Sequence, residues 1–138
     1  MGEIMNEFRK YIDNGEYQQL YEKLEARHYA YTLENVTRDF KEVSSEKKYT
    51  YLMYAIACSE TPELHLLICD MLLFTDTFFF DMYTLQKWHL KRALEISPNN
   101  VQVLQWITCT FSGHPDSPFS KEELTAYNVL LKSLLSND

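Results

Sequence analysis

The hydrophobic pattern of this chain is densest over residues 61–74, where almost every side chain is apolar. On a helix, which turns by about 100° per residue, these side chains cover nearly the whole circumference, and only Glu63 and Asp70 form a narrow polar stripe. Thr61 is placed to cap the helix, and Pro62 falls at its first position, where a missing N–H costs nothing. The stretch is too short to cross a bilayer, so we expect a central helix enclosed by other helices.

Apolar residues also recur at helical spacing near the N-terminus. A first helix is expected over residues 3–13, because Asn14-Gly15 supplies the left-handed conformation that ends a helix. A second apolar stripe begins at Tyr17 and is expected to run on through Tyr31. With so short a connection, the two helices should form an antiparallel hairpin.

The pattern weakens over residues 33–45, where we expect a short helix capped by Asn35. Ser45 then opens a longer helix that reaches Cys58 and pairs with the central helix. After the central helix, Asp76 or Thr77 is placed to cap a long helix with two apolar faces, which a helix needs when it is packed between neighbours.

The last helix carries the clearest start signal. Ser120 and Glu123 have the spacing of a capping box, and Phe119 is placed to pack onto Leu124. The helix shows one apolar stripe and one polar face. Such a helix suits the end of a helical stack, so we expect it to be a C-terminal cap.

One part of the chain, about residues 83–111, resembles a tetratricopeptide repeat. The resemblance rests on the end of a helix and the turn that follows it: Leu90, Ala93, Leu94, Pro98, Asn99 and Asn100. Leu104, Ile107 and Phe111 then stand where the next helix of such a repeat has apolar residues. Gln86 and Thr108 depart from the small residues usual in the family. The resemblance implies stacked helical hairpins.

Composition supports a helical protein. The chain has 138 residues, of which 46% are hydrophobic, with three glycines and four prolines, too few for many short strands. We therefore expect a single all-α domain over residues 1–138, with seven or eight helices stacked as antiparallel hairpins. The three cysteines, Cys58, Cys69 and Cys109, form no Cys-x-x-Cys pair and are expected to be reduced and buried. No export signal is visible, so we expect a cytoplasmic location.

The charge is negative and unevenly placed. Thirteen Lys and Arg stand against twenty Asp and Glu, a net charge of −7, and no Lys or Arg occurs between Lys48 and Lys87. Nucleic-acid binding needs the opposite sign, and no membrane segment is present, so neither partner is expected. The charge favours a basic protein partner.

Catalytic and ligand motifs are absent from the sequence. His65 and Cys69 have the i,i+4 spacing of two metal ligands, but no third ligand accompanies them, and a buried thiol beside a hydrogen-bonded histidine is the preferred interpretation. We therefore expect no enzyme, no metal and no cofactor. Tyrosines such as Tyr29 and Tyr31 gather in the N-terminal half, where they either pack between helices or meet a partner.

These observations lead us to expect a protein-binding module. Its most concrete form is an immunity protein or antitoxin that inhibits a basic toxin domain. The alternatives are a tetratricopeptide-like adaptor or chaperone with a peptide groove, and a helical metal-dependent enzyme around His65 and Cys69. The expected contact residues are acidic and aromatic residues between Lys48 and Lys87, where no Lys or Arg balances the negative charge. They are Glu63, Asp70, Asp76, Phe78, Phe79, Asp81 and Tyr83.

Overall fold

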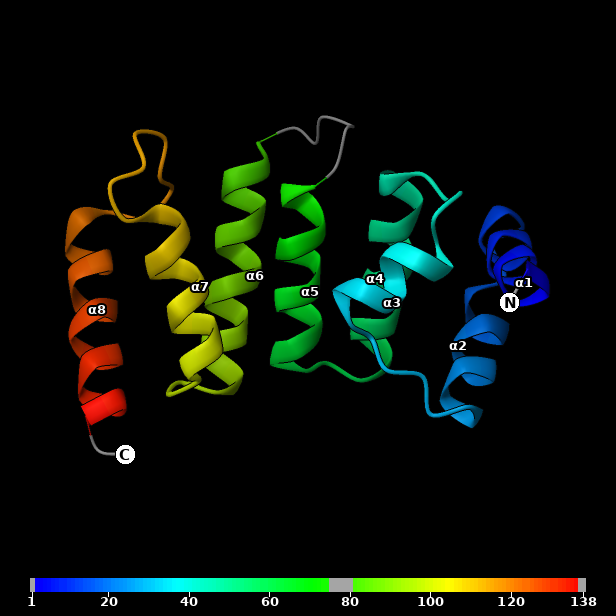
Figure 1. The fold of residues 1–138 in the computed structure, drawn as a ribbon, viewed down its shortest axis with the longest axis horizontal. Coiled ribbons are helices and arrows are strands. Elements are labelled where there is room, and N and C mark those ends of the chain that lie inside the picture. The colour runs from blue at the N-terminus through cyan, green and yellow to red at the C-terminus, as the bar shows by residue number, and fades with distance from the viewer. Residues whose placement is uncertain (1, 75–80, 137–138) are drawn as a thin grey trace. The chain divides into compact units, whose positions relative to one another are not determined.

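The computed structural model describes residues 2–74 and 81–136, with side chains from residue 8 onward. Over these ranges the chain forms eight α-helices and no strand (Figure 1), which confirms the all-α fold. The helices are α1 (Gly2–Asp13), α2 (Tyr17–Ala26), α3 (Leu33–Asp39), α4 (Ser45–Cys58), α5 (Pro62–Leu73), α6 (Met82–Ile96), α7 (Val101–Phe111) and α8 (Lys121–Ser136). In the part of the chain so described, no helix is both long and apolar enough to cross a membrane.

The residues divide into two compact units. The first comprises Met1–Glu60 and Asp70–Phe79, and the second comprises Thr61–Cys69 and Phe80–Asp138. Helices α1 to α4 belong to the first unit and α6 to α8 to the second, while α5 contributes residues to both. The single domain over residues 1–138 stays a prediction.

The first unit has an aromatic core. Helix α1 packs on α2 and α3, and α2 packs on α4. The ring of Phe40, which follows α3, lies 5.0 Å from that of Phe8 in α1 and stacks on Tyr51 of α4 at 5.7 Å. All three side chains are fully buried, so one run of rings joins three helices.

The turn between α1 and α2 is the one that the Asn14-Gly15 pair predicts. Gly15 has a φ of 69°, and its N–H donates to Ile12 O at 3.1 Å. The N–H of Glu16 donates to Tyr11 O at 2.8 Å, which completes a Schellman motif. The left-handed residue closes α1 and starts the hairpin.

Helix α2 ends earlier than its apolar pattern predicts. The expectation that it runs through Tyr31 is wrong, because His28 takes a left-handed conformation with a φ of 53°. The N–H of His28 donates to Glu25 O at 3.1 Å, and the N–H of Tyr29 donates to Leu24 O at 3.0 Å. This is the same Schellman motif as at Gly15, here on a residue with a Cβ.

Two further helix starts lie close to their expected places. The cap of α3 is Thr32, whose Oγ1 accepts from the N–H of Asn35 at 3.1 Å, so Asn35 is not the cap. The cap of α4 is Ser44, whose Oγ accepts from the N–H of Lys47 at 3.2 Å. In both cases a side-chain hydroxyl accepts from the backbone N–H three residues later. That N–H lies in the first turn of the helix and has no partner within the helix.

Helix α5 is enclosed over most of its length, as its pattern predicts. Thr61 Oγ1 accepts from the N–H of Leu64 at 3.2 Å, which confirms the cap. The buried side chains of α5 are Leu64, His65, Leu67, Ile68, Cys69, Met71 and Leu72. Leu73 and Phe74 are instead 41% and 76% exposed, because the enclosure ends with the helix.

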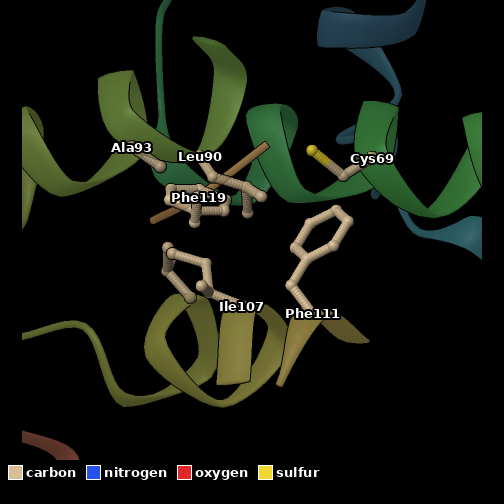
Figure 2. Packing of buried hydrophobic residues seen from close by; sticks show 7 residues of the cluster. Cys69, Leu90, Ala93, Ile107, Phe111 and Phe119 are labelled. Carbon is tan, nitrogen blue, oxygen red and sulfur yellow. The ribbon is translucent and has the colours of Figure 1, made fainter. Parts of the chain in front are cut away.

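The core of the second unit lies among α5, α6, α7 and the segment before α8. Figure 2 shows Leu90 and Ala93 of α6 facing Ile107 and Phe111 of α7, with Cys69 of α5 beside them. Phe119 joins the same cluster, and its ring lies 5.6 Å from that of Phe111. Successive helices α6, α7 and α8 run in opposite directions (Figure 1), as stacked hairpins require.

A turn joins α6 to α7 within the stretch whose sequence resembles a tetratricopeptide repeat. Helix α6 ends at Ile96, and Asn100 caps α7, since its Oδ1 accepts from the N–H of Val103 at 3.1 Å. The two departures from the family pattern, Gln86 and Thr108, are both buried. Thr108 Oγ1 donates to Leu104 O at 3.0 Å, so its hydroxyl is bonded within α7.

The starts of α8 and α6 differ. In α8 the capping box is formed in both directions: Ser120 Oγ accepts from the N–H of Glu123 at 3.1 Å, and Glu123 Oε1 accepts from the N–H of Ser120 at 3.0 Å. Helix α6 begins after Asp81, which has a φ of 54° and no side-chain cap bond. The expected caps Asp76 and Thr77 lie outside the described residues.

We predict that His28→Gly stabilises the protein by about 0.5–1 kcal/mol, because glycine adopts the left-handed conformation without a Cβ penalty. Gly15→Ala is the matched control at the same motif, where an added Cβ would meet nothing within 4 Å. It should cost about 1 kcal/mol through the backbone alone. Chemical unfolding of both variants gives the comparison, and equal midpoints would contradict the prediction.

Candidate binding groove

An open groove of about 310 Å³ lies on the second unit, where α6, the turn after it, α7 and α8 meet. Leu94, Pro98, Leu104 and Leu130 form its apolar lining, and the Tyr127 ring lies among them. Leu104 is fully buried, while Leu94, Tyr127 and Leu130 are half-buried. The three helices therefore leave Leu94, Tyr127 and Leu130 partly uncovered in the groove.

The rim of the groove carries both charges. Lys91 Nζ pairs with Glu123 Oε2 of α8 at 2.8 Å. Lys87, one turn earlier on α6, donates to Glu123 Oε1 at 3.3 Å and to Pro118 O at 2.8 Å. Glu95, the other charged residue of the lining, accepts from Arg92 at 2.8 Å. The two bonds to Glu123 join α6 to α8, whereas the Arg92–Glu95 pair lies within α6.

Glu123 is the electrostatic centre of this rim. The hydrogen bond from Lys91, with those from the Ser120 N–H and Lys87, lowers the pKa of the Glu123 carboxyl to about 2. The same contact raises the pKa of Lys91. Because Glu123 is also part of the capping box, one carboxylate closes the start of α8 and fixes two lysines of α6.

Of the seven residues predicted to contact a partner, the four that the structure describes do not line this groove. Glu63, at the start of α5, and Asp81, before α6, are exposed, and Asp70 is half-buried. Tyr83 is half-buried and packs on the second-unit core, with its ring 6.0 Å from that of Phe111. The other three, Asp76, Phe78 and Phe79, lie outside the described residues.

The aromatic pairs of the N-terminal half pack inside the first unit. The rings of Tyr29 and Tyr31 lie 5.1 Å apart. Tyr29 donates to Asp39 Oδ2 at 2.9 Å, and the hydroxyls of Tyr31 and Tyr51 share a 2.9 Å bond. Burial raises the pKa of Tyr31 to about 12. The sequence left two interpretations open for Tyr29 and Tyr31, packing between helices or contact with a partner. In the structure they pack between helices.

His65 has a partner that the sequence pattern did not reveal. Its Nδ1 lies 2.8 Å from Nδ1 of His89 on α6, and both rings are fully buried. Burial, with the charge of His65, lowers the pKa of His89 to about 4. Cys69 Sγ donates to Gln86 O at 3.6 Å. Within residues 2–74 and 81–136, no three His, Cys, Asp or Glu side chains are grouped as metal ligands would be.

Comparisons with known proteins found no match: no family model, no curated protein and no solved structure is significantly similar to this chain.

Only part of the groove has a signal in the sequence. Leu94, Pro98 and Leu104 belong to the stretch that resembles a tetratricopeptide repeat, but the resemblance did not single them out as a binding site. Tyr127 and Leu130 stand in a stripe like that of any packed helix. The sequence does not tell whether neighbouring helices cover an apolar residue fully or only partly. The groove could therefore be found only in the tertiary structure.

The expectation that all three thiols are buried is wrong for two of them, since Cys58 and Cys109 are exposed and only Cys69 is buried. Cys58 is the last residue of α4, where the enclosure of that helix ends. We predict that Cys58 and Cys109 react with iodoacetamide in the native protein, whereas Cys69 reacts only after unfolding. Mass spectrometry of timed digests measures the order, and early labelling of Cys69 would contradict it.

We predict that Glu123→Gln lowers the free energy of unfolding by about 1 kcal/mol at pH 7, because it removes the charge that holds Lys87 and Lys91. The folded-state pKa lies below the ordinary value, so this stability is present above about pH 4.5 and is lost as the pH falls through 2. Glu122→Gln, an exposed neighbour, is the control. Urea unfolding at several pH values tests this, and equal losses for the two variants would contradict it.

Proposed function

We propose that this chain is a non-enzymatic protein-binding module that holds a peptide segment of a partner in the groove between α6, α7 and α8. The carrying observation is the groove itself. Its volume of about 310 Å³ lies at the lower end of the range for ligand pockets, about 300–1,000 Å³. An apolar floor with a few charged groups at the rim is typical of sites that bind apolar side chains.

The resemblance to tetratricopeptide repeats supports this proposal. Leu94, Pro98 and Leu104 carry the resemblance and also line the groove. A helical stack of this kind presents its grooves to extended or helical peptides. The proposed class is therefore a tetratricopeptide-like adaptor or chaperone, with α8 as the terminal helix.

A second candidate is an immunity protein or antitoxin that inhibits a basic toxin domain. The observation that favours it is the charge: the net charge is −7, no Lys or Arg lies between Lys48 and Lys87, and Glu63 and Asp81 in this stretch are exposed. Such a surface would steer a basic partner and raise its association rate at low salt. A cytoplasmic location fits either candidate.

Selection of a random peptide library on the folded protein tests the groove. We predict that peptides enriched for apolar residues are selected, and that Leu130→Lys weakens their binding at least about tenfold, because it places a charge in the apolar floor. Val129→Lys is the matched control, since Val129 is 63% exposed and is not part of the lining. Fluorescence anisotropy measures the affinities, and circular dichroism verifies the helical content of each variant.

The same selection separates the two candidates. If the selected peptides bind the Leu130→Lys variant as tightly as the original protein, the groove is not their binding site. Basic peptides whose association slows steeply with salt, and whose binding is lost in Glu63→Lys but kept in Leu130→Lys, would favour the acidic surface. Leu130→Gln serves as a milder second variant if the lysine disturbs folding.

A further inference from the structure

Two buried histidines join α5 to α6 in the second unit. Their Nδ1 atoms lie 2.8 Å apart, and neither ring is exposed to solvent. Only one proton fits between two nitrogens at this distance, so one Nδ1 donates and the other accepts. The observed geometry is therefore that of a pair with at least one neutral ring.

An indole ring and a second polar contact lie beside the pair. Trp88 is 52% exposed, and its ring lies edge-on to both histidines, 5.8 Å from His65 and 4.9 Å from His89. One turn along, Cys69 and Gln86 exchange two bonds: Cys69 Sγ donates to Gln86 O, and Gln86 Nε2 donates to Cys69 O at 3.2 Å. Gln86 Oε1 is buried and has no hydrogen-bond partner among the described residues.

The charged residues nearest the pair in sequence lie on its own two helices. On α6, Arg92 is one turn beyond His89 and donates to Glu95 at 2.8 Å. Helix α7, which packs on α6, contains no charged residue. On α5, the carboxylates are Glu63, which is exposed, and Asp70, which is half-buried, and the thiol of Cys69 lies one turn after His65. Burial and, after it, the charge of His65 lower the pKa of His89.

Protonation of both rings would break this contact. Two N–H groups would then face each other at 2.8 Å, and two like charges would lie in a site without solvent. Burial lowers the pKa of His89 to about 4, whereas a histidine in water titrates near 6.5. At a pH between these two pKa values, the opened pair binds more protons than the closed pair. Lowering the pH therefore shifts the equilibrium toward the opened pair.

We propose that the His65–His89 pair is a pH-sensitive contact that releases α5 from α6 in mildly acidic solution while the helices persist. Gln86, whose buried side-chain oxygen has no hydrogen-bond partner among the described residues, lowers the stability of the neighbouring contact between α5 and α6. The contact between α5 and α6 is therefore expected to open before the apolar contact between α6 and α7 does. The proposal is independent of the peptide groove. For one proton taken up on opening, the open fraction rises up to about tenfold per pH unit between about pH 6.5 and 4.

Cys69 reports the opening, because it is buried one turn from His65. In a Cys58→Ser, Cys109→Ser background, its reaction with 2,2′-dithiodipyridine, a reagent that still attacks thiols in acid, is timed from pH 7.5 to 4. Rates are divided by those of the denatured protein at each pH. We expect the normalised rate to rise steeply below pH 6.5 while far-ultraviolet circular dichroism keeps its helical signal.

The control replaces both rings in the same background, His65→Leu with His89→Leu, and should have a flat normalised rate. Three outcomes would each overturn the proposal. The normalised rate could stay flat in the protein with both histidines, its rise could persist in the double leucine variant, or its rise could occur only with loss of the helical signal. If the leucine variant does not fold, Trp88 fluorescence in Trp106→Phe decides. It should fall over the same pH range, since protonated imidazole quenches a neighbouring indole, and an unchanged signal would overturn the proposal.

Discussion

Burial of helices that are apolar on more than one side is the constraint on which this structure depends. Helix α5 has buried side chains around most of its circumference, and α6 has one apolar face toward α7 and a second, with its histidine, toward α5. Neither helix is stable alone in water, because exposing such faces costs about 25 cal/mol per Å² of apolar surface. Their neighbours are therefore required, and the short connections of the chain supply them as hairpins.

Local bonds then determine where each helix starts and stops. The caps of α3, α4, α5, α7 and α8 each use a side chain that accepts from an N–H three residues later. The ends of α1 and α2 share one motif, although Gly15 adopts it freely and His28 does so against its Cβ. Glu123 extends this local role, since the carboxylate that closes the capping box also binds Lys87 and Lys91.

The second unit combines an apolar core with two features that such a core does not need. One is the groove, where α6, α7 and α8 leave Leu94, Tyr127 and Leu130 half-covered. The other is the polar contact of His65, Cys69, Gln86 and His89, which places hydrogen-bonding groups where apolar residues would pack without a desolvation cost. Departures of this kind from simple packing are where function is expected, and both proposals rest on them.

The sequence by itself determined the all-α class, most helix boundaries and the caps at Thr61 and Ser120, because helical periodicity and capping bonds involve residues close together in the chain. Only the tertiary structure decided the rest. His65 and His89 are 24 residues apart, and the groove joins side chains of three helices, so no local pattern encodes either. The exposure of Cys58 and Cys109 likewise depends on how far neighbouring helices extend, because burial is a property of the surroundings rather than of the residue.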